Sequence, residues 1–418
     1  MQQHLKKMME NALTEHETPH RVNRYISEAD WDKIYEAIKT HEFSFFPNSL
    51  NPNSYKNLMP WESLNKIITE HRLCSPRMRL FKNGESIPEN DYSVSKISPG
   101  NTVFIDILVE RLYYYLREGA SLIIDAIEEL YQPLKDFTIG LENLLNLPIK
   151  VNAYLSWKDV RGFEKHWDGH DVLILQIHGK KKWFIYGKTQ KYPVYMNPHC
   201  EINVPEKHIW DKTLEEGDLL YIPRGMWHHA EAINEPSLHL TFGIKRNIAT
   251  DYINWLQEQL FKKEEFRKDI PFSDEIIKLD EYQRDIKKSI IHALEEYTLE
   301  SFLIYKRSKI HRKSINLPFA AQSLIFKKPL NEYAIKTTCY NSSNLDIKNG
   351  NGILKFNGKV LHFSKSCYNF FSVLSNNEVH SLEKLLNILP KKTNQENKLL
   401  FITSLVHKGI IEVLKYNN

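Results

Sequence analysis

One motif constrains this chain more than any other: His166-x-Asp168, followed 62 residues later by His228. An imidazole and a carboxylate two residues apart point to the same side of an extended segment. His228 lies in GDLLYIPRGMWHHAEA, which begins with a Gly-Asp turn and continues as a short apolar strand. Two histidines and one carboxylate form a facial triad that leaves metal positions open, as is typical of non-haem Fe(II) oxygenases. The fold must therefore bring these three side chains together from separate segments.

Other histidines compete for the same role. His229 follows His228 directly, and adjacent residues on a strand face opposite ways, so only one of the two can bind the metal. Strand periodicity alone does not choose between them. We expect His178 to lie near a turn of the β domain, and His170 to lie near the metal without binding it.

The pattern around the motif predicts a β domain. Val172–Ile177 is a continuous apolar run, which is typical of a strand buried on both faces. Short alternating segments and Gly/Pro turns flank this run, without helical periods between them. Such a series predicts a β barrel or a double-sheet jelly roll. The predicted strands are 149–156, 172–177, 182–186, 219–222 and 237–244.

Upstream of these strands the pattern is mixed. The segment MRLFKNGESI predicts two strands joined by a hairpin turn at Asn83-Gly84. Residues 119–137, GASLIIDAIEELYQPLKDF, place apolar residues at helical spacing, and we predict a helix there.

Beyond Arg246 the sequence becomes helical. Residues 250–263 and 273–305 are rich in Glu, Lys, Leu and Ile, with one apolar face. This module either packs on a second subunit or covers the β domain, and the two interpretations carry equal weight. In the last part, Ser381 and Asn394 are predicted to begin two helices, which Pro390 and Gly409 end, and the strand IIEVL follows. This order is compatible with a winged helix, and the predicted domains are 1–248, 249–312 and 313–418.

Composition bounds the class of protein. A chain of 418 residues is too long for one compact core. No apolar run of about 18 residues is present, so we expect no membrane span. The N-terminus lacks the apolar core of a signal peptide, and the four cysteines are scattered, as expected for a cytoplasmic protein.

The basic charge is concentrated at the C-terminal end. Residues 313–418 carry 14 lysines and six acidic residues, a local charge of +8 against a total of +4. A nucleic acid or an acidic partner could bind there. A solvated lysine-rich surface is the favoured interpretation, since no arginine cluster or aromatic–basic interleaving is present.

A buried cation and two donors are candidates for binding a co-substrate. In Fe(II) sites of this type a lysine pairs with the distal carboxylate of a 2-oxo acid, because a carboxylate buried in a pocket needs such a partner. Lys181 lies 15 residues after His166. If it points inward, its neighbours Lys180 and Lys182 point to solvent. Asn152 and Tyr154 share one strand face and can donate to the same co-substrate, or they can simply buttress the barrel.

Together the motifs resemble one known family. NAY, GFEKHWD, GKKKW, GDLLYIPRGMWHHAE and SLHLTFG resemble the JmjC-type ribosomal oxygenases of the cupin superfamily, closely over about residues 119–246. The resemblance implies an α+β protein: a double-stranded β-helix (jelly roll), a helical dimerisation region and a winged-helix-like domain. It implies an Fe(II)- and 2-oxoglutarate-dependent dioxygenase that uses O₂ to hydroxylate a side chain. The implied substrate is an Arg or His of a ribosomal protein, or a ribosomally made peptide.

The resemblance also assigns residues. It implies that the catalytic metal ligands are His166, Asp168 and His228, and that the 2-oxoglutarate contacts are Lys181, Asn152 and Tyr154. The family commonly has a small polar residue where this chain has Gly243, which removes one hydrogen bond to the co-substrate. A cytoplasmic homodimer is expected. The alternatives are an N-methyl-lysine demethylase and a non-enzymatic cupin protein associated with nucleic acid.

Overall fold

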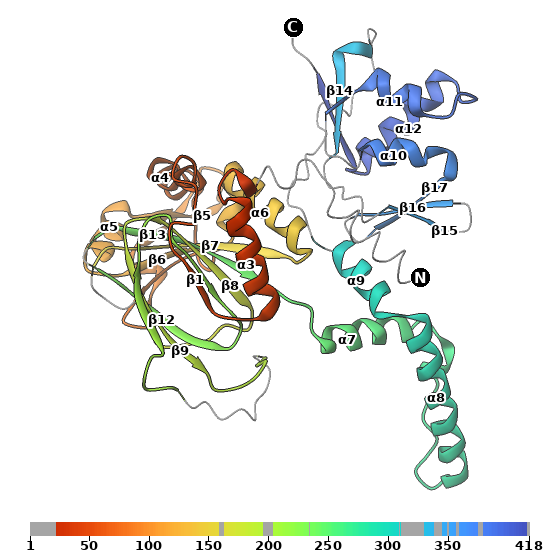
Figure 1. The fold of residues 1–418 in the computed structure, drawn as a ribbon, viewed down its shortest axis with the longest axis horizontal. Helices are drawn as coiled ribbons and strands as arrows, with labels where there is room; N and C mark the ends of the chain where they lie inside the picture. The colour runs from red at the N-terminus through yellow and green to blue at the C-terminus, as the bar shows by residue number, and fades with distance from the viewer. Residues whose placement is uncertain are drawn as a thin grey trace. The chain divides into compact units, whose positions relative to one another are not determined.

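The computed structural model of this protein describes residues 22–158, 163–194, 204–233, 235–308, 310, 330–337, 345–348, 351–356, 359–374 and 379–415. The chain divides into two compact units. The N-terminal unit ends at Arg246, and the C-terminal unit contains the chain from Asn247 onward. Both helices and antiparallel sheets are present, so the fold is a mixed α/β fold (Figure 1).

Two antiparallel sheets form the centre of the N-terminal unit. The large sheet has eight strands in the order β1-β11-β8-β13-β7-β6-β2-β3, and the small sheet has the order β10-β9-β12. The strands of the large sheet are β1 Ser44–Phe46, β2 Met78–Lys82, β3 Glu85–Ile87, β6 Ser121–Ile124, β7 Ile149–Ser156, β8 Asp171–His178, β11 Leu219–Ile222 and β13 Ser237–Ile244. Those of the small sheet are β9 Lys181–Lys188, β10 Trp210–Leu214 and β12 Met226–Ala232, and a separate hairpin joins β4 Ser93–Ile97 to β5 Val103–Ile107.

The large sheet is covered on both faces. On one face Leu173 and Leu175 join a core that includes residues of four helices. On the other face Val172 and Ile174 pack with Trp183 and other residues of the small sheet. Strand β8 is therefore buried on both faces, which confirms the interpretation of its continuous apolar run. The helices are α3 Glu28–Thr40, α4 Trp61–Glu70, α5 Val109–Arg117 and α6 Gln132–Leu145.

The helix predicted for residues 119–137 was wrong over its first half. Ser121–Ile124 is strand β6, and helix α6 begins only at Gln132. Strand β6 lies between β2 and β7, where Ile123 pairs with Arg79 on one side and Tyr154 on the other. All four of its residues are buried, so the strand is covered on both faces, and a short apolar run such as 122–124 fits a strand as well as a helix.

The predicted hairpin turn is confirmed. Strands β2 and β3 pair, and the two turn residues, Asn83 and Gly84, have φ of 52° and 81°. Two successive positive φ values belong to the type I′ turn, whose twist matches that of the strands it joins.

The C-terminal unit begins with helices α7 Ala249–Leu260, α8 Ile276–Glu296 and α9 Leu299–Ser308. Trp255 of α7 packs on Phe302 of α9, with ring centroids 5.7 Å apart. Helix α8 buries little of its surface, and several of its large apolar side chains are exposed: Ile276, Ile277, Ile290, Ile291 and Leu294. The structure thus confirms helices in both predicted segments.

The end of the chain has its own core, which contains residues of three helices and two small sheets. Ser381 Oγ accepts a hydrogen bond from Lys384 N, and Asn394 Oδ1 accepts one from Asn397 N, so both predicted N-caps are confirmed. Gly409 follows the second helix with φ of 70°, as a helix stop requires. The elements are β14 Tyr333–Thr337, β15 Leu345–Lys348, β16 Asn351–Phe356, β17 Lys359–Ser364, α10 Tyr368–Leu374, β18 His380–Ser381, α11 Leu382–Ile388, α12 Gln395–His407 and β19 Ile411–Lys415.

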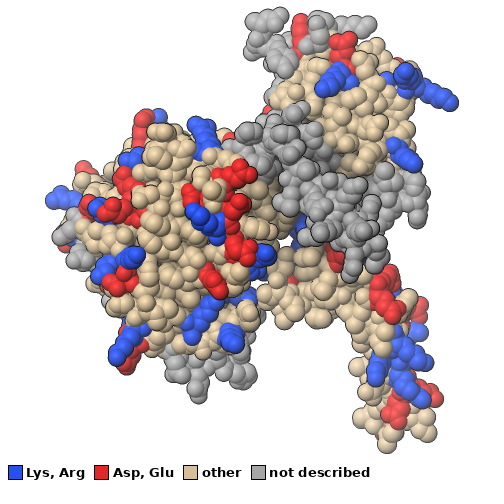
Figure 2. All heavy atoms as spheres, viewed as in Figure 1, with Lys and Arg blue, Asp and Glu red and all other residues tan. Residues whose placement is uncertain are grey.

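Two surface properties complete the description. None of the described helices is both long enough and apolar enough to cross a membrane. On the face of the N-terminal unit seen in Figure 2, basic and acidic side chains are interspersed, so this face presents no extended field of one sign.

Candidate metal centre and co-substrate pocket

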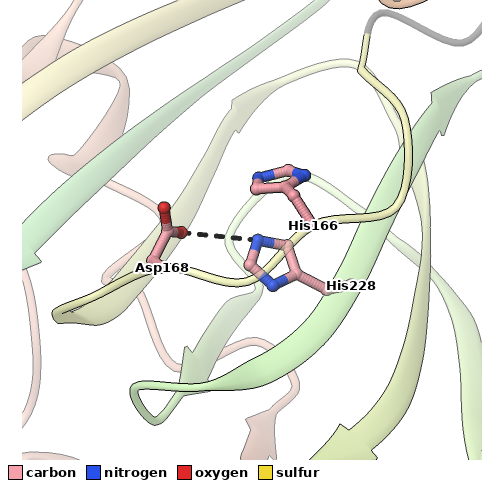
Figure 3. Close-up of side chains that lie close together, drawn as sticks. All are labelled: His166, Asp168 and His228. Atoms are coloured by element: carbon pink, nitrogen blue, oxygen red, sulfur yellow. Dashed lines mark ion pairs between the residues drawn. The ribbon is translucent and has the colours of Figure 1, made fainter. Parts of the chain in front are cut away.

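His166, Asp168 and His228 converge in the N-terminal unit. One potential ligand atom from each residue lies within 4.8 Å of those of the other two, and Figure 3 shows the side chains turned toward one another. His228 is on β12, whereas the other two lie between β7 and β8. Backbone hydrogen bonds join the segments: His228 N donates to His166 O at 2.8 Å, His166 N to His228 O at 3.1 Å, and Gly225 N to Asp168 O at 3.0 Å.

Both imidazoles are oriented by a backbone carbonyl. Nδ1 of His166 lies 2.9 Å from Glu164 O, and Nδ1 of His228 lies 2.9 Å from Met226 O. A carbonyl oxygen only accepts, so each Nδ1 carries the hydrogen and each Nε2 keeps its lone pair for a metal. His228 Nε2 is 3.5 Å from Asp168 Oδ2.

Burial, reinforced by the nearby His166, lowers the pKa of His228 to about 4. The neutral imidazole is the form that binds a metal, so His228 is in its ligating form across the physiological pH range. Two imidazole nitrogens and one carboxylate oxygen at the wall of a cavity are a donor set that fits Fe(II).

The adjacent His229 points to the other face of β12. Its ring stacks on Phe184 with centroids 4.5 Å apart, and its Nδ1 lies 3.1 Å from the hydroxyl of Tyr186. Only His228 of the two therefore reaches the centre, which the sequence pattern alone left open.

A cavity of about 250 Å³ adjoins the three residues. It lies between the two sheets and extends toward β6 and β2. Its polar lining beyond the triad consists of Arg79, Ser121, Tyr154, Lys181, Trp183, His239 and Thr241, and its apolar lining includes Ile123, Phe163, Val172 and Ile174.

Lys181 is a buried cation in this cavity. It is 5% exposed, its Nζ donates to Ser156 Oγ at 3.1 Å, and no carboxylate of the described residues pairs with it. Burial lowers the pKa of Lys181 to about 8. A buried charge without a counter-charge is costly, so the site is suited to a ligand that carries an anionic group.

The two neighbouring lysines have ordinary partners outside the cavity. Lys180 Nζ lies 2.5 Å from Glu215, and Lys182 Nζ lies 3.2 Å from Asp211. The side chains are 44% and 38% exposed. The expected register, with one inward lysine between two outward ones, is therefore found.

Tyr154 and Asn152 differ in their access to the cavity. Tyr154 lines it and stacks on His239 with parallel rings 4.9 Å apart, and burial raises the pKa of its hydroxyl above the usual range. Asn152 is not among the lining residues; its Oδ1 accepts from Ala126 N at 3.2 Å, and its side chain hydrogen-bonds Tyr154. Asn152 thus orients Tyr154, and a co-substrate contact of its own stays a prediction.

The structure bears on Gly243, where a lost hydrogen bond to the co-substrate was expected. A Cβ atom on Gly243 would lie 2.8 Å from His170 Nε2, so the His170 ring occupies the space of a side chain there. The polar residues of β13 that line the cavity are instead His239 and Thr241.

Sequence reasoning missed His239, Trp183, Arg79 and Ser121. His239 is 3% exposed, and burial together with Lys181 holds its pKa well below the ordinary value. Both His239 Nδ1 and Trp183 Nε1 are buried without a hydrogen-bond partner among the described residues. The period of two along β9 and β13 could have revealed this pair, because Trp183 follows Lys181 by two and His239 precedes Thr241 by two. The helix predicted at residues 119–137 concealed Ser121.

Comparisons with known proteins agree with this geometry. The JmjC domain family matches residues 133–252. The "Bifunctional lysine-specific demethylase and histidyl-hydroxylase NO66" of Drosophila erecta is 26% identical over 217 residues, which cover 50% of this chain and 30% of that protein. The protein of the same name from Dictyostelium discoideum is 27% identical over 194 residues, which cover 45% and 36%. The chain thus spans about a third of the length of these relatives.

Solved structures extend the likeness to most of the chain. The Escherichia coli ribosomal oxygenase YcfD, solved in complex with cobalt and 2-oxoglutarate, superimposes with a TM-score of 0.60 at 16% identity. The match covers 93% of this chain and 99% of that chain. At this level of identity the likeness establishes a shared fold.

Proposed function

We propose, from the match of residues 133–252 to the JmjC domain family, that this chain is an Fe(II)- and 2-oxoglutarate-dependent oxygenase that hydroxylates a side chain in a protein or peptide. The observation that carries the proposal is the presence, in one cavity, of a facial triad and a buried lysine to which none of the described residues offers a carboxylate partner. Iron and 2-oxoglutarate together supply the oxidising chemistry: O₂ and 2-oxoglutarate are consumed, succinate and CO₂ are released, and one oxygen atom enters a substrate C–H bond.

The residues of this chain divide the work. His166, Asp168 and His228 hold the iron from one side and leave its other side open to the cavity. Lys181 binds the distal carboxylate of 2-oxoglutarate, and the Tyr154 hydroxyl donates to the same co-substrate. Ile174 and Phe163 exclude water from the reacting groups. The part of the lining that Arg79 of β2 and Ser121 of β6 supply receives the substrate.

The substrate is a polypeptide side chain in this proposal. YcfD is named a ribosomal oxygenase, and the NO66 proteins are named histidyl-hydroxylases, which favours a ribosomal protein; a ribosomally made peptide is the other member of the class. The NO66 name also contains a demethylase activity. Demethylation of a methylated lysine is not favoured, because the site offers no observation that requires it, and it would release formaldehyde where hydroxylation does not.

The finer architecture belongs to the same proposal. The two antiparallel sheets form a double-stranded β-helix, the helices of residues 249–312 form the dimer interface through the exposed apolar face of α8, and residues 313–418 form a winged-helix-like domain. The protein acts as a cytoplasmic homodimer, and nucleic-acid binding by the lysine-rich end is not favoured.

Turnover of 2-oxoglutarate tests the proposal directly. Purified protein with Fe(II), 2-oxoglutarate and a ribosomal fraction is expected to form succinate and to add one oxygen atom to a polypeptide, read by intact-mass spectrometry. Asp168→Ala is the matched inactive control, because it removes the single anionic ligand. Absence of any succinate above this control, with ribosomal fractions and with peptide pools, would overturn the proposal.

A further inference from the structure

The chain neighbours of the two ligating histidines meet on the outer face of the small sheet, opposite the cavity. His229 follows His228 on β12, and Lys165 precedes His166. Tyr186 of β9 contacts both of these neighbours. Its hydroxyl lies 3.1 Å from His229 Nδ1, and Lys165 Nζ lies 4.4 Å from the centre of its ring. One tyrosine therefore links the two ligand-bearing segments from behind.

His229 is held from several directions. Its Nε2 lies 3.1 Å from Glu231 Oε1, and a carboxylate only accepts, so Nε2 carries the hydrogen. Nδ1 is then an acceptor, and the Tyr186 hydroxyl donates to it. The imidazole also stacks on Phe184 with an angle of 2° between the planes. His229 is 3% exposed and Tyr186 8% exposed, so these hydrogen bonds are shielded from water.

Lys165 is anchored as well. Its Nζ donates to Pro205 O at 3.3 Å and to Glu206 O at 3.4 Å, while it lies over the Tyr186 ring. The ammonium group thus ties the segment before His166 to the loop that precedes β10. The lysine and the adjacent ligand point to opposite sides of the same backbone, as the period of two requires.

The pairing of β12 with β9 is irregular at the ligand. The register shifts between Trp227 and His228, which marks a β-bulge or similar irregularity. Trp227 pairs with Gly187 and His228 with Ile185, so Tyr186 of β9 is the extra residue that has no pairing partner on β12. The irregularity thus lies at the residue whose side chain contacts both His229 and Lys165.

We propose that Tyr186, His229 and Lys165 form a positioning device that fixes the separation of His166 and His228 and thereby sets the metal affinity of the centre. The inference rests on the proposed metal site and adds to it. None of the three residues is a candidate metal ligand, and none of them lines the cavity. Each is therefore a positioning residue. Groups that hydrogen-bond directly to metal ligands control affinity by about 10- to 100-fold. These three residues act one residue further out, through the backbone that carries the ligands, so the lower end of that range is expected.

Cobalt(II) binding to the metal-free protein tests the device, measured by calorimetry together with the visible absorption of the bound ion. The variants are Tyr186→Phe, which removes one hydroxyl, and Lys165→Met, which removes the cation over the tyrosine ring. The matched control is Lys212→Met, because Lys212 lies on β10 of the same sheet and places its Nζ 5.2 Å from the centre of the Phe45 ring of β1. We expect the dissociation constant to rise about tenfold in both variants and to stay unchanged in the control.

The midpoint of thermal unfolding, measured for each metal-free variant, shows whether the three residues position the metal ligands or only stabilise the small sheet. If the midpoint falls while the dissociation constant stays that of the wild type, the device only stabilises the sheet and the inference is overturned. If Tyr186→Phe does not fold, the same two measurements on Lys165→Met test the inference. A wild-type protein that binds no cobalt would instead overturn the proposed metal site itself.

Discussion

Lys181 Nζ lies 3.1 Å from Ser156 Oγ, and this neutral hydroxyl is the hydrogen-bond partner that the described residues give to a 5% exposed ammonium group. The two residues lie on different sheets, β9 and β7. A cation held by a hydroxyl and enclosed by apolar and aromatic side chains binds a carboxylate far more strongly than an exposed lysine would.

Replacement of Lys181 by Ala is expected to raise the dissociation constant for 2-oxoglutarate by about 100-fold, or about 3 kcal/mol, because it leaves a buried ligand carboxylate unpaired. Lys180→Ala is the control, since that lysine is exposed and pairs with Glu215. Calorimetric titration of the metal-loaded proteins measures both. Equal losses in the two variants would show that the lysine register is wrong.

The affinity for 2-oxoglutarate should depend on pH. Burial lowers the pKa of Lys181 to about 8, so the ligand-free lysine loses its proton as the pH rises through 8. The ligand carboxylate favours the charged form and raises this pKa in the complex. Binding above pH 8 therefore takes up a proton, and the dissociation constant rises up to about tenfold per pH unit. Titrations in buffers of different ionisation enthalpy measure the proton uptake; a constant affinity from pH 7 to 9.5 would contradict it.

Metal retention should distinguish the histidines near the centre. His166→Ala and His228→Ala are each expected to abolish stoichiometric cobalt(II) binding, because two ligands do not hold the ion in an open site. His170→Ala should retain it, since His170 lies beside Gly243 and outside the cavity lining. Elemental analysis after loading and gel filtration gives the stoichiometry. Loss of metal from the His170 variant would place that residue among the ligands.

A side chain at residue 243 should conflict with His170. Gly243→Ala places a Cβ atom 2.8 Å from His170 Nε2 and is expected to lower the free energy of unfolding by about 1 kcal/mol or more, through overpacking. His170→Ala in the same protein should recover most of this loss. Urea denaturation of the four members of this double-mutant cycle measures the coupling. Additive effects would mean that the ring moves aside at no cost.

The pairing of His166 with Asp168 was predictable because the two residues are local in sequence. His166 and Asp168 share a strand-like segment, and a histidine after a Gly-Asp turn supplies the third donor. The hairpin at Asn83-Gly84 and the N-caps at Ser381 and Asn394 were predictable for the same reason, since each depends on the conformational preference or hydrogen bonding of a few adjacent residues.

The part of the cavity lining that β6 and β2 supply was not predictable in this way. Ser121 and Ile123 were assigned to a helix, because a short apolar run such as 122–124 does not distinguish a buried strand from a buried helix. Ser121 and Ile123 belong to a strand because β6 pairs with β2 on one side and with β7 on the other. This pairing places both residues, with Arg79, beside the triad. That pairing joins segments tens of residues apart, so no local pattern encodes it.

The sequence by itself determined the types of donor, the alternation that separates Lys181 from Lys180 and Lys182, and the presence of a β domain followed by helices. Only the tertiary structure decided between His228 and His229. It also showed that Asn152 bonds Ala126 and does not line the cavity, and that His239 contacts both Tyr154 and Trp183. The physical reason is that periodicity fixes which residues share a face, whereas the side of a strand that faces the cavity depends on what packs against each face.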